Sequence, residues 1–268
     1  MKRILAVLLA GLMLLSLAAC GGKDDAVVKI GVLEGPGYNT NVSQAHEAHR
    51  QSSGRTEKIN YNNLSSALLD LESGKIAYVL VEECVAEYVI ARNENVAIGV
   101  KDGVTNYSMM TSDSNKEVYD ILNNAIKAMK EDGTLDSLIE NELKAYINSD
   151  PVAKDLPKFD GARTIKIGVT GDVPPMDFVA ANGQAAGFNI ALLAEIANRA
   201  QVNIELVQID TGSRPMALSS GKVDAVFWTK NRICGVCSEE RAEKIDGTLV
   251  TESYFADYAA SLVLKSDK

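Results

Sequence analysis

Residues that commonly carry chemistry are scarce in this chain. Its 268 residues include two histidines, four cysteines and one tryptophan. The histidines, His46 and His49, stand three apart in QAHEAH, a spacing that suits a metal pair on a helix. No third ligand lies near them in the sequence, so we expect an exposed helix face and no metal. No Ser/His/Asp or Cys/His set of a nucleophilic enzyme is visible, and no cofactor is expected.

Basic residues are also in deficit. The chain has 27 lysines and arginines against 36 aspartates and glutamates, a formal net charge of −9. A surface of that sign repels phosphate groups, which argues against nucleic acid and anionic lipid headgroups as partners.

Only one long apolar run is present, residues 4–19, directly after two basic residues. It is too short to span a bilayer comfortably, and its charged start predicts an export signal, residues 1–19. The sequence LAAC, which ends at Cys20, resembles the lipobox of bacterial lipoproteins. The resemblance implies a lipidated Cys20 on a tether, 20–26, as the sole membrane anchor of an extracytoplasmic protein. The alternative is an ordinary secretory signal cut near a cysteine.

Three further cysteines follow that position. In an exported protein, Cys234-Gly-Val-Cys237 can close a tight disulfide, which leaves Cys84 unpaired. A CxxC can instead be a redox pair or half of a zinc site, but a second CxxC and nearby histidine ligands are absent. A structural disulfide is therefore the preferred interpretation.

What the chain does have is an internal repeat. VVKIGVLEGPG at 27–37 matches TIKIGVTGDVPP at 164–175, and LESGKIAYVLV at 71–81 matches LSSGKVDAVFW at 218–228. Each copy begins with a β-branched strand, continues through a helical stretch that ends in Ser-Gly-Lys, and closes with an apolar run typical of a buried parallel strand. We expect the glycine before each lysine to take the left-handed conformation that ends helices.

The second copy has the rhythm of an α/β fold. Apolar residues recur at helical spacing in FNIALLAEIANRA, 188–200, and VNIELVQI, 202–209, alternates as a strand does. This order of strands and helices predicts an open, mostly parallel sheet flanked by helices. The first copy follows the same rhythm with a less regular first helix around 41–50.

Helical stretches and a linker separate the copies. Residues 114–134 carry an apolar face, and 135–148 continue the helical pattern. Residues 149–163 contain two prolines, mixed charge and no periodicity, so they are predicted to be a linker.

The second copy resembles the first lobe of the bacterial extracellular solute-binding proteins that supply polar amino acids to ABC importers. The similarity rests on KIGVTGDVPPMDF, NGQAAGFNIALLAEIA, ALSSGKVDAVF, SEER and ESYF, which span nearly all of 164–264. KIGVLEGPGYNT and LLDLESGKIAYVLVEECVAEY resemble the second lobe, and KAMKEDGTLDSLI resembles the tail of the same family. The resemblance implies a two-lobed, periplasmic-binding-protein-like (type 2) α/β fold.

The order of these parts is inverted relative to that family, whose members run first lobe, second lobe, tail. This chain runs second lobe (27–113), tail helices (114–148), linker (149–163) and first lobe (164–268), which suggests a circular permutation. Permutation is tolerated where chain ends lie close together at the surface. The tail helices are then expected to pack on the lobe of 164–268. The alternative is a fusion of two truncated, nonfunctional copies.

The resemblance also places charged residues where the two charges of an amino acid need partners. Arg241, in SEER, matches the family's carboxylate-binding arginine, whose guanidinium can donate two parallel hydrogen bonds. Glu82 stands where the family has an ammonium-binding aspartate, at the end of a buried strand that faces the ligand crevice. The alternatives are a surface arginine within a charged run and an exposed acid at a strand end.

Further contacts follow from the same resemblance. The backbone N–H groups of Gly37 and Tyr38 can bind an anion at a helix start, although the family's two threonines are missing there. Trp228 is positioned to replace the aromatic ring that the family has at Val173; its alternative is packing in the core or at the rim. Polar contacts are expected from Thr170, Thr229 and Asn231.

These residues predict a binding protein rather than an enzyme. A small polar solute, an amino acid in the first place, enters between the lobes, and the closed, monomeric form docks on an ABC transporter permease. Two alternatives stay open. One is a dehydratase-like enzyme on the same scaffold with Glu82 as its acid or base, and the other is a decayed, ligand-free interaction protein.

Overall fold

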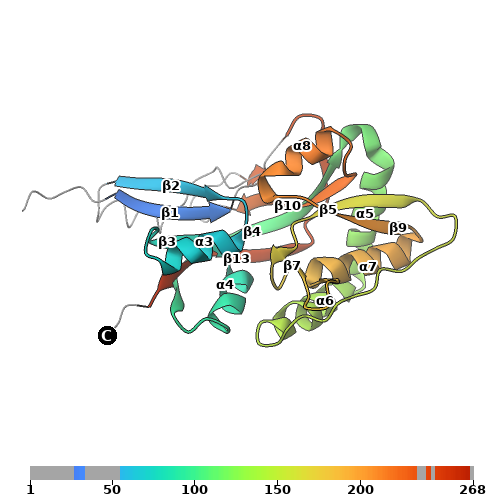
Figure 1. The fold of residues 1–268 in the computed structure, drawn as a ribbon. Helices are drawn as coiled ribbons and strands as arrows, with labels where there is room; N and C mark the ends of the chain where they lie inside the picture. The colour runs from blue at the N-terminus through green and yellow to red at the C-terminus, as the bar shows by residue number, and fades with distance from the viewer. Residues whose placement is uncertain (1–26, 34–54, 234–239, 243–244, 266–268) are drawn as a thin grey trace, which may run out of the picture.

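The computed structural model describes residues 27–33, 55–233, 240–242 and 245–265. Within them, one ten-stranded sheet runs through the molecule in the order β2-β1-β3-β13-β4-β10-β5-β9, with β11 paired to β10 and β12 paired to β4. The sheet has two ends of similar build, which lie at the left and right of Figure 1 and which we name the N-terminal unit and the C-terminal unit.

The N-terminal unit is built on three parallel strands, because β2 and β3 both pair in parallel with β1. The apolar run that predicts β3 is almost wholly buried, as expected of a strand covered on both faces. Gly74 follows helix α3 with φ +70, which confirms the predicted left-handed position. The elements are β1 (Val27–Leu33), β2 (Arg55–Tyr61), α3 (Leu64–Glu72), β3 (Tyr78–Glu82) and α4 (Glu83–Ile90).

The C-terminal unit repeats this plan. Strand β9 and the first part of β10 pair in parallel with β5, and Gly221 ends the helix before β10 with φ +69. The predicted helix and strand of 188–209 are both present, and the apolar face of the helix is buried. The elements are β5 (Thr164–Val169), α7 (Phe188–Ala200), β9 (Asn203–Gln208), α8 (Arg214–Ser219) and β10 (Ala225–Ile233).

Two long strands join the units. Strand β4 (Val96–Ser112) pairs antiparallel with β10 and with β12 (Thr248–Val250), so it enters the sheet of the C-terminal unit. Strand β13 (Phe255–Leu264) leaves the C-terminal unit and pairs antiparallel with β3 and β4. Each unit therefore has three parallel strands and, beside them in the sheet, a strand from the other half of the chain. This strand is β13 in the N-terminal unit and β4 in the C-terminal unit.

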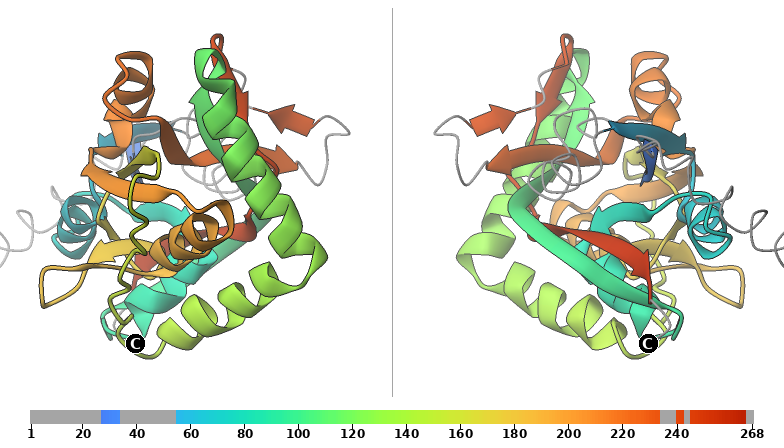
Figure 2. Two further views of the ribbon diagram at one scale, coloured as in Figure 1. Left: turned by 90° about the vertical axis from the view of Figure 1, so that its right-hand side faces the viewer. Right: turned by 90° about the vertical axis from the view of Figure 1, so that its left-hand side faces the viewer.

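The helices between the units in sequence lie against the C-terminal unit. Helix α5 (Lys116–Glu131) contacts α7 and β12, and α6 (Thr134–Glu142) contacts α7 (Figure 2). The buried side of α5 is its apolar face, including Leu122 and Ile126. A 3₁₀ turn, η1 (Asp113–Asn115), precedes α5.

Smaller elements complete the described part. Residues 149–163 hold no helix or strand apart from a β-bridge between Ala153 and Ala186. A three-stranded sheet in the order β6-β7-β8 lies near the start of α7. The remaining elements are η2 (Lys144–Tyr146), β6 (Asp172–Val173), β7 (Asp177–Val179), β8 (Ala185–Ala186), η3 (Thr211–Ser213) and β11 (Glu240–Ala242).

The predicted α/β fold, with open parallel sheets flanked by helices, is confirmed. One apolar core extends through both units, since it includes Val79 and Val85 from one and Ile167 and Leu193 from the other. The helix predicted around 41–50 lies outside the described residues. None of the helices described is long and apolar enough to cross a membrane. The division into lobes in permuted order stays a prediction.

Candidate functional site

Glu82 ends strand β3 in a buried position, at the start of helix α4. Only 2% of its surface is exposed, and its Oε1 accepts a hydrogen bond from the Tyr107 hydroxyl at 2.9 Å. Tyr107 lies on β4, so this bond links the N-terminal unit to a crossing strand. The alternative interpretation of Glu82 as an exposed acid is therefore wrong. A buried carboxylate has to be satisfied by hydrogen-bond donors or opposite charge, and a bound cationic group would supply both.

Asp257 is a second acid of this region, and the sequence analysis missed it. Its carboxylate accepts hydrogen bonds from the backbone N–H groups of Cys84 and Tyr258, both at 2.9 Å. Burial, and to a smaller extent the neighbouring charge of Glu82, raise the pKa of Asp257 to about 6, although the hydrogen bonds from Cys84 and Tyr258 act in the opposite direction. The one signal in the sequence is that Asp257 is the only acid within the largely apolar strand β13.

Cys84, the cysteine predicted to be unpaired, is free and buried beside these two acids. Burial raises the pKa of its thiol well above the usual value, and the charges of Asp257 and Glu82 raise it further. A thiol in such surroundings is not ionised near neutral pH, so Cys84 does not have the properties of a nucleophile.

The raised pKa of Asp257 has a consequence for stability. The ordinary value is 3.8 and the folded value is about 6, so between these pH values the folded state binds more protons than the unfolded state. The free energy of unfolding is therefore expected to fall as pH rises through this window, by at most about 3 kcal/mol. Urea unfolding of the wild type and of Asp257→Asn from about pH 4 to about pH 7 measures the effect.

Asparagine at this position keeps an oxygen that can accept from Cys84 but has no charge to bury. The difference in stability between Asp257→Asn and the wild type should therefore grow as pH rises, in favour of the variant. A difference that stays constant over the whole pH range would contradict the assignment.

Strand register relates Arg241 to this region. Arg241 on β11 pairs with Arg232 on β10, Arg232 pairs with Thr105 on β4, and Thr105 pairs with Asp257 on β13. The four positions form one row across the sheet, three strand spacings or roughly 14 Å wide. The backbone thus aligns Arg241 with Asp257. Asp257 lies two residues before Ala259, which is the residue of β13 that pairs with Glu82. The side chain of Arg241 lies outside the described part of the structure.

Thr229 occupies a buried position on β10, directly opposite Ser108 of β4. Both side chains are fully buried, and neither hydroxyl oxygen has a hydrogen-bond partner among the described residues. Two such hydroxyls can serve a polar ligand group or a water molecule. Ser108 and Tyr107 are consecutive, so their side chains point to opposite faces of β4. The register therefore does not place Thr229 on the face from which Tyr107 reaches Glu82.

Thr170 is also buried, but its hydroxyl is already used. The Thr170 Oγ1 donates to the Asp177 carboxylate at 2.6 Å, and the backbone N–H groups of Thr170 and Gly171 donate to the same oxygen at 3.2 and 2.7 Å. Asn189, in the first turn of α7, donates to the other Asp177 oxygen at 3.0 Å. These bonds fix the loop after β5, and a ligand contact by Thr170 stays a prediction.

Other predicted site residues cannot be placed in the same way. The side chains of Trp228 and Asn231 lie outside the described part, although both residues belong to β10. The described ranges hold no group of three histidine, cysteine, aspartate or glutamate side chains that could bind a metal ion. The predicted residues that fall wholly outside the described residues are Cys20, Gly37, Tyr38, His46, His49, Cys234 and Cys237.

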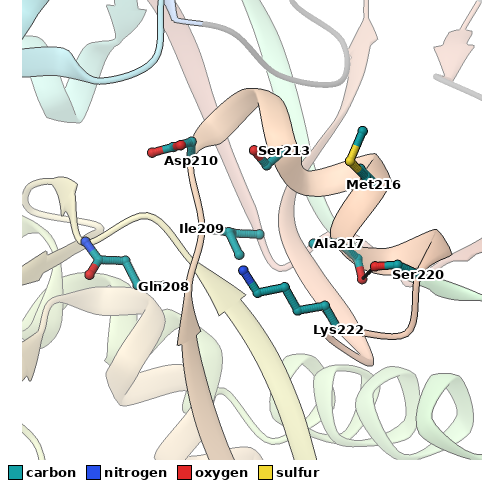
Figure 3. Close-up of a pocket in the computed structure, with 8 residues that line it drawn as sticks. All are labelled: Gln208, Ile209, Asp210, Ser213, Met216, Ala217, Ser220 and Lys222. Atoms are coloured by element: carbon teal, nitrogen blue, oxygen red, sulfur yellow. Dashed lines mark hydrogen bonds between the residues drawn. The ribbon is translucent and has the colours of Figure 1, made fainter.

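A separate pocket of about 440 Å³ lies between the end of β9 and helix α8 (Figure 3). Ile209 and Ala217 form its buried floor, and the Lys222 side chain extends back toward β9 beneath Ile209. Asp210 also lines the pocket, but no described ion pair joins it to Lys222. Most of the lining is exposed, and none of the predicted ligand residues belongs to it.

The later part of the chain matches a known family. Residues 165–268 match the model of the bacterial extracellular solute-binding proteins, family 3. No curated protein matches the chain.

Solved structures overlap with nearly the whole chain, at low identity. The GluR0 ligand-binding core from Nostoc punctiforme with L-glutamate has a TM-score of 0.40 at 9% identity, covering 90% of this chain and 85% of its own. CbnR, a LysR family transcriptional regulator, has a TM-score of 0.47 at 10% identity, covering 99% and 72%. The periplasmic aliphatic sulphonate-binding protein SsuA from Escherichia coli has 0.39 at 11% identity, covering 87% and 61%. These scores are low, and the overlaps carry no argument about activity.

Proposed function

We propose that the protein binds a small polar solute, an amino acid or a similar zwitterion, as the substrate-binding component of an ABC importer. The observation that carries the proposal is the match of residues 165–268 to the solute-binding family. The N-terminal unit supports it, because its strand order and its added crossing strand repeat the plan of the C-terminal unit. Ligands of open α/β sheets bind at the carboxyl ends of the strands, and Glu82 is at such an end.

The roles of the site residues follow from charge. Glu82, buried and hydrogen-bonded by Tyr107, is proposed to receive the ammonium group of the solute. Arg241 is proposed to bind the carboxylate, and its register row leads across the sheet to the neighbourhood of Glu82. The proposed further contacts, from hydroxyl, amide, aromatic and backbone groups, are Thr170, Trp228, Thr229, Asn231, Gly37 and Tyr38.

The permuted order belongs to this proposal as well. Helices α5 and α6 contact α7 of the C-terminal unit, as expected if this unit is the first lobe, to which the tail of the family returns. The strandless segment 149–163 then connects the former chain ends. A lipid on Cys20 would hold the monomeric protein at the outer face of the cell membrane, within reach of its permease.

Replacing Glu82 with glutamine tests the solute site. Isothermal titration against the common amino acids should identify a ligand of the wild type. Loss of the charge in Glu82→Gln should weaken its binding about 10- to 100-fold, since a hydrogen bond to a charged group contributes about 1.5–3 kcal/mol. Glu94→Gln is the matched control, because Glu94 is exposed and its substitution should leave the affinity unchanged.

Three results would contradict this scheme in different ways. Absence of binding by any amino acid, with the protein folded, would remove the proposed solute class. Equal affinity of Glu82→Gln and the wild type would remove Glu82 from the site. Chemical turnover of a bound solute that is lost in Glu82→Gln would indicate an enzyme instead of a binding protein.

A further inference from the structure

The two units also touch each other away from the crossing strands. The backbone N–H of Leu64, the first residue of α3 in the N-terminal unit, donates to Asp172 Oδ2 of the C-terminal unit at 3.1 Å. A second bond runs between the same regions, from the Thr211 hydroxyl to the Asn62 carbonyl at 3.3 Å. Helix α3 and strand β6 are in contact, so the two bonds belong to a continuous interface.

These contacts complete the start of α3. The first N–H groups of a helix have no partner within the helix, and side-chain oxygens commonly cap them. Asn63, the residue before α3, caps Ser66 N–H at 2.8 Å with its own side chain. Asp172 caps Leu64 from the other unit. One helix end is thus capped partly by its own unit and partly by the opposite one.

Asp172 is held firmly in the position from which it caps. It follows Thr170 and Gly171, whose N–H groups are both bonded to Asp177, and Gln208 Nε2 donates to the Thr170 carbonyl at 3.4 Å. Gly171 has φ +75, a conformation that favours glycine. Because the loop is fixed by its own unit, it presents the Asp172 carboxylate to α3 without further ordering.

The surroundings of Asp172 fit a contact that forms when the units meet. Burial raises the pKa of its carboxyl, while the Leu64 N–H and the charge of Arg214 lower it. Arg214 is itself only 3% exposed, at the start of α8 beside η3. The aspartate is therefore half-buried, with a donor on the opposite unit and, on its own unit, the charges of Asp177 and Arg214.

We propose that Asp172 is a latch between the units, which caps helix α3 of the N-terminal unit and so holds the two units together. Any motion that separates the units has to break the Leu64–Asp172 and Asn62–Thr211 bonds, while the crossing strands β4 and β13 stay continuous. The latch sets how easily the units part, and it does so without any solute, so it goes beyond the proposed function.

The test compares two substitutions of Asp172 in the full chain, without added solute. Asp172→Ala removes the acceptor, and amide hydrogen exchange at Leu64, followed by NMR, should accelerate about fivefold, the factor that corresponds to a helix cap of ordinary strength. The radius of gyration from small-angle X-ray scattering should rise at the same time. Asp172→Asn keeps an oxygen acceptor and should retain slow exchange and the compact form.

Asn63→Ala is the matched control, because it removes the cap that α3 receives from its own unit. It should accelerate exchange at Ser66 and leave the radius of gyration unchanged. Circular dichroism establishes that each variant is folded. Unchanged exchange at Leu64 and unchanged scattering in folded Asp172→Ala would overturn the latch, and so would an equal expansion in Asn63→Ala. Since no solute is present, none of these outcomes bears on solute binding.

Discussion

Replacing Asp177 with alanine is expected to lower the free energy of unfolding by about 3–5 kcal/mol. The Asp177 side chain is only 1% exposed, and its two oxygens accept hydrogen bonds from the described groups Thr170 N–H and Oγ1, Gly171 N–H and Asn189 Nδ2. Alanine would leave these donors without this acceptor, and those of Thr170 and Asn189 are buried. Each unsatisfied buried donor costs about 1–3 kcal/mol, partly recovered when the loop relaxes. Urea unfolding followed by circular dichroism measures the loss.

Two further variants separate this mechanism from a general effect of removing a carboxylate. Asp177→Asn keeps one accepting oxygen and should lie between the wild type and Asp177→Ala. Asp210→Ala removes an exposed carboxylate near the end of β9 and should change stability by less than about 0.5 kcal/mol. A loss of less than about 1 kcal/mol in Asp177→Ala would mean that the loop does not depend on this network.

Local sequence patterns predicted the elements of each unit well. The helix of 188–200 and the strand that follows it were expected from periodicity, and both are present within one residue of the expected start. The left-handed glycines Gly74 and Gly221 followed from their place between a helix and a buried strand. These features depend on neighbours in the chain, which is why a single sequence is enough to find them.

The crossing strands could not be predicted in the same way. Strand β4 spans Val96–Ser112 and pairs with β13 over 96–107, with β10 over 105–111 and with β12 over 110–112. The sequence of β4 does not predict which strands pair with it or which residues are opposite one another, because the register between distant strands is set by the packing of the whole sheet. The contact of Asp257 with Cys84 joins residues 173 positions apart and was missed for this reason.

The candidate site shows the same division between local and distant information. Glu82 was placed at the end of a strand by its pattern, but its hydrogen bond from Tyr107 of β4 joins residues 25 positions apart. Thr170 was expected to contact a ligand, yet its hydroxyl donates to Asp177, a partner that no spacing rule identifies. Polar residues near a strand end can therefore be proposed as site residues from sequence. Whether their polar atoms are already hydrogen-bonded within the protein or are available to a ligand can be seen only in the folded structure.

Glycine 187 offers a second substitution with a large expected effect, at the start of α7. Gly187→Ala should destabilise the protein by about 3–5 kcal/mol, because two separate penalties add. A Cβ at this position would lie 2.5 Å from the Met176 carbonyl oxygen and 2.7 Å from the Pro175 carbonyl oxygen. Those carbonyls cannot retreat freely, since they accept hydrogen bonds from Asn189 and Phe188 N–H at 2.8 and 3.0 Å. The φ of +106 adds the cost that any side chain meets in this region.

Gly183→Ala is the matched control, because Gly183 has a φ of +81 but nothing within 4 Å of an added Cβ. It carries the conformational penalty alone and should cost about 1–2 kcal/mol. The difference between the two variants in urea unfolding then combines the cost of pushing apart the carbonyls that receive the first N–H groups of α7 with the stricter backbone conformation of Gly187, whose φ of +106 and ψ of 174 suit almost only glycine. Equal losses of stability in Gly187→Ala and Gly183→Ala would mean that the backbone at the start of α7 can shift at little cost. The close approach of Gly187 to the Met176 and Pro175 carbonyls would then not hold α7 in place.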